Sequence, residues 1–140
     1  MDIHQFGGIS NDRIDVVSLA PATMFGVLSN KKKLEKIKNK YKLSNGFVLY
    51  VGDVNWNKNI GGLLKAFRNI KYQISKSKEQ AQEPSLKELK LILVGRAFKN
   101  ICILEMCEIN DLIKTLKLTK DIKKLGFVPD EDLAAVFKSY

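Results

Sequence analysis

Apolar runs alternate with stretches of helical periodicity along most of the chain. Three short runs rich in β-formers predict buried strands over residues 47–52, 89–95 and 122–128. After each run, apolar residues recur at spacings of three and four, which predicts amphipathic helices over 58–74, 104–116 and 129–140. Such an alternation of strands and helices indicates an α/β fold with a parallel sheet and right-handed crossovers.

The first 46 residues are predicted to lead into this domain. Residues 14–20 (IDVVSLA) are largely apolar and are closed by Pro21, a pattern typical of a further buried strand. Residues 30–42 predict a helix that Asn30 caps and that carries lysines on most of its faces. We therefore divide the chain into a lead-in strand and basic helix (1–46) and a Rossmann-like three-layer domain (47–140), with about four parallel strands in the sheet.

The net charge of the chain favours some classes of binding partner without singling one out. The 140 residues carry a formal net charge of +9, and lysine supplies nearly all of the positive charge. A basic balance favours anionic partners such as nucleotides, nucleic acid or a membrane surface, although an AT-rich genome produces the same composition. Because the lysines are spread over most predicted elements, no specific nucleic-acid interface is expected. The lysine-rich helix is either a solvated face or a site of peripheral membrane contact.

Neither metal chemistry nor a membrane span is indicated by the sequence. Cys102 and Cys107 are five residues apart with no histidine nearby, a spacing that fits neither a CxxC redox motif nor a zinc site. No apolar run approaches the length of a spanning helix, and no signal-peptide pattern opens the chain. We expect a cytoplasmic protein without a metal or another cofactor.

A ligand site is expected where the parallel strands end. In open α/β sheets, ligands bind beyond the carboxyl ends of the strands, which here are Gly52–Asp53, Gly95–Arg96 and Gly126–Val128. The first of these opens a loop and a helix, and a helix amino terminus presents unpaired N–H groups to phosphate. Lys58 would add a positive charge there, although a lysine at a helix start is more often only solvated. The loop is neither a Walker A motif nor a GxGxxG fingerprint.

Three blocks of sequence make this interpretation more specific. They are YVGDVNWNKNIGGLLKAFRNI (50–70), LKLILVGRA (89–97) and IKKLGFVPDEDLAAVFKSY (122–140). In this order the blocks resemble the carboxyl-terminal, nucleotide-sugar-binding domain of the family 4 (group 1) glycosyltransferases of the GT-B type. A weaker similarity to the linker strand of that family covers residues 14–25.

The resemblance implies an activity and its partners. Members of this family carry out retaining transfer of a sugar from a nucleotide-diphosphate donor, normally without a metal. We therefore expect a transferase of the hexosyl type, with a nucleotide-sugar donor and, in the full enzyme, a glycan or lipid-linked acceptor.

The resemblance also assigns roles to single residues. Gly52 would border the phosphate loop, and Lys58 would neutralise the donor diphosphate as it leaves. Gly95 and Arg96 would line the donor cleft. The turn formed by Phe127 and Val128 would meet the nucleobase. No residue of the chain is assigned a catalytic role.

Two departures from the family pattern limit what the chain is expected to do alone. Asp53 stands where many members carry an arginine, so it either pairs with Lys58 or weakens the binding of phosphate. The acidic motif and the acceptor domain of the family have no counterpart in the 140 residues, so we expect a fragment of the donor-binding domain that is not active alone. The alternatives are a non-catalytic nucleotide-binding module and a truncated remnant. The uncovered sheet edge also favours self-association.

Overall fold

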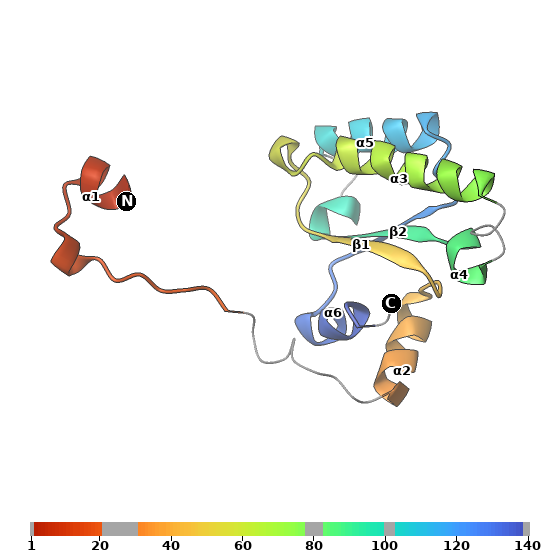
Figure 1. Cartoon of the computed structure of the whole chain (residues 1–140), viewed down its shortest axis with the longest axis horizontal. Helices are drawn as coiled ribbons and strands as arrows, with labels where there is room; N and C mark the ends of the chain where they lie inside the picture. Colours follow the sequence, from red (N-terminus) through yellow and green to blue (C-terminus); the bar gives the residue numbers. More distant parts are fainter. Residues whose placement is uncertain (1, 21–30, 78–82, 100–102, 139–140) are drawn as a thin grey trace.

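The computed structural model describes residues 2–20, 31–77, 83–99 and 103–138. Three short strands alternate with helices over residues 31–138, after two short helical turns near the amino terminus (Figure 1). In chain order the elements are α1 (Asp2–Gly7), η1 (Asn11–Arg13), α2 (Lys31–Tyr41), β1 (Phe47–Val51), η3 (Trp56–Lys58), α3 (Ile60–Lys76), α4 (Pro84–Lys87), β2 (Lys90–Val94), η5 (Arg96–Lys99), α5 (Leu104–Thr115), β3 (Ile122–Gly126) and α6 (Asp130–Val136).

The strands form one parallel sheet in the order β1-β2-β3, so β2 is central. The pairing of β2 with β3 is irregular at one point. Leu93 lies opposite Lys124, whereas the next residue, Val94, lies opposite Gly126, so Leu125 is an extra residue in β3. This register shift sets which residues of β3 meet the end of β2.

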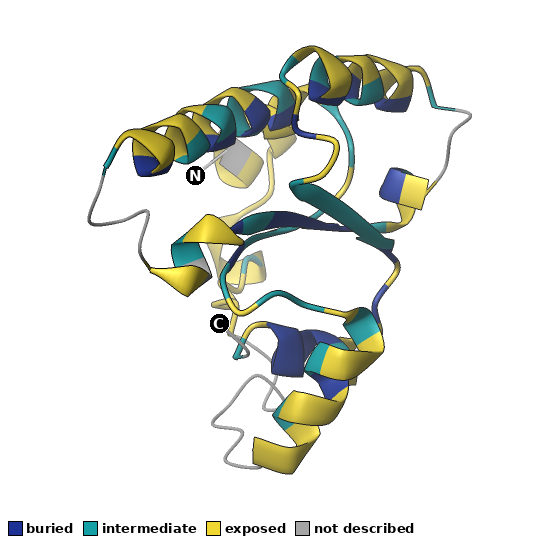
Figure 2. Cartoon of the chain, turned by 90° about the vertical axis from the view of Figure 1, so that its right-hand side faces the viewer, coloured by how far each residue is buried: buried dark blue, intermediate teal, exposed yellow. Residues whose placement is uncertain are grey.

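Helices cover both faces of the sheet, which confirms the predicted three-layer α/β fold. Figure 1 shows α3 and α5 over one face and α2 and α6 over the other. Because side chains alternate along β2, its residues contribute to the hydrophobic cores on both faces of the sheet. Leu91 and Leu93 belong to the core beneath α3 and α5, and Ile92 and Val94 belong to the core beneath α2 and α6. Buried residues accordingly lie on the strands and on the helix sides that face them (Figure 2).

The carboxyl end of β2 is the tightest point of the sheet. A Cβ atom added to Gly95 would lie 2.1 Å from the backbone oxygen of Gly52, well inside the contact distance of any two heavy atoms. The Gly95 φ of +156° is also a value that other residues rarely adopt. Only glycine at this position therefore allows the ends of β1 and β2 to stay paired.

A polar contact joins the two helices on the second face. The Tyr41 hydroxyl and the Lys40 ammonium, both near the end of α2, donate to Oδ2 of Asp132 in α6 at 2.7 and 2.5 Å. The hydrogen bond from Lys40, followed by that from Tyr41, holds the pKa of the Asp132 carboxyl below its ordinary value of 3.8. Because the charged carboxylate is the better acceptor, this contact is strongest when Asp132 is ionised.

The predicted strand over residues 14–20 is not formed. Val16, Val17 and Leu19 are 86%, 84% and 101% exposed, and the segment runs away from the sheet (Figure 1). A β-branched apolar run satisfies the pattern of a buried strand, but a strand also needs a backbone partner, and none of the described strands pairs with it. The described sheet therefore has three strands, not about four.

Several expectations fall on residues outside the described ranges. Asn30, the predicted cap of the basic helix, and Cys102 are among them. Within the described ranges, no helix combines the length and the apolar character that crossing a membrane requires.

The Gly95 contact predicts a large and local loss of stability. We expect Gly95→Ala to lower the free energy of unfolding by roughly 3 kcal/mol, because its methyl group would separate the ends of β1 and β2. Gly61→Ala, within helix α3, is the matched control, since a Cβ there would make an ordinary contact of 3.6 Å with a Leu112 methyl group of α5. This control should raise stability by about 0.5 kcal/mol. Urea unfolding of both variants measures the difference, and equal stability of the two would contradict the argument.

The Asp132 contact predicts a loss of stability that depends on pH. Tyr41→Phe should lower the free energy of unfolding by about 1 kcal/mol near neutral pH. The pKa of Asp132 is depressed in the folded state, so its contribution is present above the unfolded pKa and is lost as the pH falls through the folded pKa.

The deficit of Tyr41→Phe should therefore shrink in acid. Tyr72→Phe serves as the control, because Tyr72 is exposed and its hydroxyl has no hydrogen-bond partner among the described residues. Urea midpoints measured across the acid range test this. A deficit that stayed constant at pH values well below 3.8, the ordinary pKa of this carboxyl, would show that Asp132 ionisation is not involved.

Candidate functional site

The carboxyl ends of all three strands meet at one edge of the sheet. Beyond the strands themselves, the Gly52 N–H donates to the Val94 oxygen at 3.0 Å, and the Gly95 N–H donates to the Gly126 oxygen at 2.9 Å. Three glycine-containing strand ends are thus hydrogen-bonded in a row. The space that a Cβ would take at these glycines is already filled, by the Tyr50 hydroxyl at Gly52, by the Gly52 oxygen at Gly95 and by the Lys99 stem at Gly126. The glycines therefore allow the strand ends to pack closely.

A cavity of about 220 Å³ lies at this edge. Five of the residues predicted for the site line it, and they come from the segments that follow β1, β2 and β3. The lining residues are Val51, Gly52, Asp53, Val94, Gly95, Gly126, Phe127, Val128, Asp130 and Leu133. The structure therefore brings together the predicted set of Gly52, Asp53, Gly95, Phe127 and Val128.

Arg96 and Phe127 interact beside this cavity. Arg96 opens the short turn η5, and its guanidinium carbon lies 4.8 Å from the centroid of the Phe127 ring. This distance is that of a cation–π contact. Arg96 does not itself line the cavity, whereas Phe127 does and remains 60% exposed. The ring therefore has exposed surface for a further planar group.

Lys58 lies apart from the other predicted residues. It ends the turn η3, is exposed, and does not line the cavity. Both Lys58 and Asp53 are described, and no ion pair joins them, so the first of the two alternatives for Asp53, a pairing with Lys58, is absent from this structure. The predicted phosphate set is thus divided, with Gly52 and Asp53 at the cavity and Lys58 outside it.

The amino terminus of α3 is partly occupied by its own cap. Asn59 adopts a left-handed conformation with φ of 46°, and its side-chain oxygen accepts the Gly62 N–H at 3.1 Å. One of the donors that a helix start offers to an anion is therefore already used. The sequence did not predict this cap, although an Asn immediately before the apolar pattern is a common signal for one.

Tyr50 and Asp130 are polar residues at this edge that were not predicted for the site. The Tyr50 hydroxyl donates to the backbone oxygen of Asp53 at 2.9 Å, and its ring packs edge-to-face on Phe98 at 5.8 Å. Burial, with a smaller effect of the Asp53 charge, raises the pKa of Tyr50 above its ordinary value of 10.0, so the hydroxyl remains a donor at neutral pH. Tyr50 thus holds the loop after β1. Asp130, at the start of α6, adds a second carboxylate to the lining.

The charges around the cavity are unevenly placed. Its lining contains the carboxylates Asp53 and Asp130 but no lysine or arginine. Two basic residues of η5 lie nearby. Arg96 contacts the Phe127 ring. The stem of Lys99 packs against Gly126, where a Cβ added to the glycine would lie 2.8 Å from that stem. Among the described residues, no group of three or more His, Cys, Asp and Glu side chains could hold a metal ion.

Comparison with known proteins assigns the chain to a family. No curated protein matched the sequence. The sequence profile of the family described as glycosyl transferases group 1 matches residues 28–140, which include β1, β2, β3 and the glycines at their ends. This match covers well over half of the chain, and the parallel sheet with helices on both faces agrees with it. The chain therefore belongs to the group 1 glycosyltransferases.

Proposed function

We propose that the cavity at the carboxyl edge binds a nucleotide-diphosphate-sugar donor for retaining transfer of its sugar. The observation that carries the proposal is the gathering of three glycine-containing strand ends around one cavity in a group 1 glycosyltransferase domain. In the complete reaction the acceptor is a glycan or a lipid-linked sugar, the transferred group is a hexosyl unit, and the setting is the cytoplasm. No metal is required, because side-chain cations stabilise the leaving diphosphate.

In this proposal each strand end has a separate role. Gly52 and Gly95 line the cavity that takes the diphosphate, and their N–H groups hold the strand ends together. Arg96 extends from the second strand end and supplies a cation beside the cavity. The exposed face of Phe127 meets the nucleobase, and buried Val128 holds that turn against the core.

Lys58 acts on the diphosphate from the loop after β1. The side chain is exposed and outside the lining, so it reaches the phosphate by turning about its flexible four-carbon stem. Asp53 works against it, since a carboxylate beside a diphosphate costs binding energy by repulsion. The donor site is therefore expected to be a weak one unless the negative charge of Asp53 is removed or screened.

The free side of β1 supports a second association. Among the described strands β1 pairs only with β2 and therefore forms one edge of the sheet, where a further strand is able to add. A second copy of the chain is one source of such a strand.

Titration with UDP-, GDP- and ADP-sugars tests the donor site and identifies its base. Asp53→Asn should strengthen donor binding about threefold to fivefold, because it removes a charge that repels the diphosphate. Lys58→Ala should weaken binding about fivefold to tenfold by the opposite effect. Lys65→Ala is the matched control, since Lys65 is an exposed lysine on α3 and should leave the affinity unchanged.

Calorimetry or thermal shift, with circular dichroism to show that each variant is folded, provides the measurement. A folded chain that shows no saturable heat with any donor would reject the donor site. Equal losses in Lys58→Ala and Lys65→Ala would reject the role of Lys58. Saturable binding without release or transfer of the sugar would favour the non-catalytic nucleotide-binding module.

A further inference from the structure

A second cavity lies at the opposite edge of the sheet, where the three strands begin. Its volume is about 340 Å³, and it is lined by the residues that precede or open each strand. These are Lys42, Leu43, Ser44, Lys90, Ile92, Lys120, Ile122 and Lys123. Half of the lining residues are lysines, and none is acidic. We call this cavity the lysine pocket.

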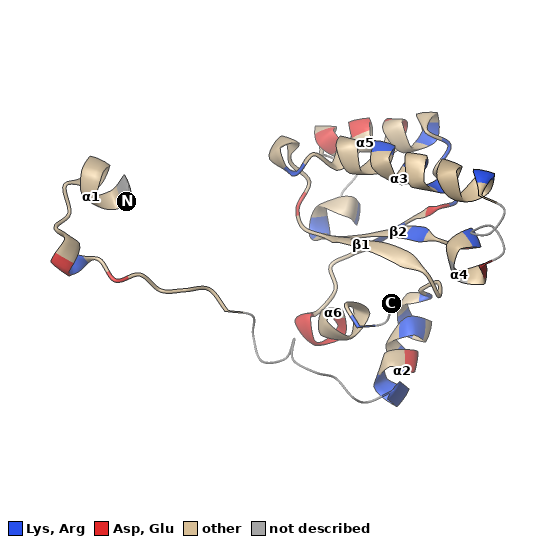
Figure 3. Cartoon of the chain, in the orientation of Figure 1, with Lys and Arg blue, Asp and Glu red and all other residues tan. Residues whose placement is uncertain are grey.

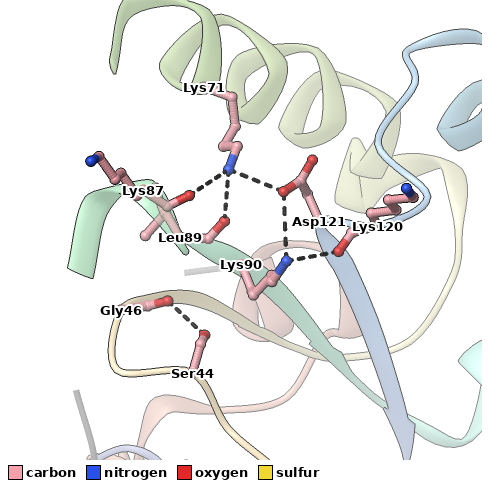
Figure 4. Close-up of polar contacts among 8 residues, drawn as sticks. All are labelled: Ser44, Gly46, Lys71, Lys87, Leu89, Lys90, Lys120 and Asp121. Atoms are coloured by element: carbon pink, nitrogen blue, oxygen red, sulfur yellow. Dashed lines mark hydrogen bonds and ion pairs between the residues drawn. The ribbon is translucent and has the colours of Figure 1, made fainter. Parts of the chain in front are cut away.

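The carboxylate of Asp121, next in sequence to the pocket residues Lys120 and Ile122, is already shared by two lysines. Oδ1 of Asp121 lies 3.0 Å from Nζ of Lys71 and 3.8 Å from Nζ of Lys90 (Figure 4). Lys90 also donates to the backbone oxygen of Lys120 at 2.9 Å. A single negative charge between two ammonium groups leaves an excess of positive charge, so Asp121 does not neutralise the pocket.

The other three lysines have no acidic partner in the described part of the chain. Lys42, Lys120 and Lys123 make no ion pair with any described carboxylate. Lys123 instead donates to the backbone oxygen of Lys42 at 2.9 Å. Burial, together with the positive charge of Lys42, lowers the pKa of Lys123 from its ordinary value of 10.5. Such a fall is the response of a cation that lacks a nearby anion.

Three uncompensated charges favour a multiply charged anion over a single carboxylate. A phosphate monoester or a diphosphate carries more negative charge than a carboxylate, and lysine binds phosphate as a point charge from several directions. The apolar walls formed by Leu43, Ile92 and Ile122 leave room for an uncharged part next to the phosphate. The lysine-rich helix α2 ends just before Lys42 and extends the positive surface outward (Figure 3).

We propose that the lysine pocket is an anion site that binds a phosphate group at the amino edge of the sheet. The ligand is either a free phosphorylated molecule or the head group of an anionic lipid, and both present the same chemistry to the four lysines. The site is at the other end of the strands from the cavity lined by Gly52 and Phe127, so it does not depend on donor binding there.

The test compares two double variants that remove the same charge. Lys42→Asn with Lys123→Gln removes two pocket lysines, and asparagine tolerates the left-handed φ of 46° at position 42. Lys65→Gln with Lys76→Gln removes two exposed lysines of α3 and keeps the pocket intact. The probes are sodium pyrophosphate, followed by NMR, and vesicles of phosphatidylcholine with and without phosphatidic acid, followed by co-sedimentation. Ionic strength is held constant throughout.

We expect the full chain to bind at least one probe, with affinity about tenfold weaker in the pocket variant and changed less than about twofold in the α3 variant. Binding of pyrophosphate alone identifies a free phosphorylated ligand. Binding of vesicles that contain phosphatidic acid identifies a lipid head group. If neither probe binds, or if both double variants lose binding equally, the proposal is wrong. Should the pocket variant fail to fold, Lys120→Gln and Lys65→Gln, two single changes at exposed positions, give the matched comparison.

Discussion

The approach of Gly95 to the backbone oxygen of Gly52 is the constraint on which the carboxyl edge of the sheet depends. An added Cβ would meet that oxygen at 2.1 Å, so the ends of β1 and β2 stay together only while position 95 has no side chain. The same pairing places Gly126 next in the row through the hydrogen bond from Gly95. The shape of this site is therefore set by the backbone of the sheet edge, and the side chains of the site lie around that edge.

The two edges of the sheet differ in charge in a way that follows from the sequence positions of acids and lysines. At the carboxyl edge, Asp53 and Asp130 line the cavity and the cations stand back from it. At the amino edge, lysines line the cavity, and the carboxylate of Asp121 is shared by two lysines. A parallel sheet collects the first residues of every strand at one edge and the last residues at the other. A small excess of acidic residues among the last positions and of lysines among the first therefore gives the two edges different charge.

The sequence allowed the three strands of the sheet and the helices between them to be predicted, because each strand is a compact apolar run and each helix repeats its apolar positions. The prediction of a strand over residues 14–20 was wrong, because an apolar run such as that around Val16 and Val17 forms a buried strand only where a neighbouring strand pairs with it. The position of Lys58 also could not be predicted. The turn η3 and the left-handed Asn59 direct the loop, and both depend on local conformations that periodicity does not reveal. Lysines 42, 90, 120 and 123 are far apart in sequence and meet only through the sheet.

The extra residue in β3 has a consequence for how this edge can vary. Leu125 has no partner of its own on β2, so its presence shifts the pairing of Gly126 with β2 by one residue. Loss of one residue here would shift Gly126, which has a left-handed φ of +74°, relative to β2, and would move the exposed Phe127 and the buried Val128 that follow it. The side chains exposed at the carboxyl edge therefore depend on the number of residues in β3. In a related chain, an insertion or deletion within this strand would move the whole turn that follows it.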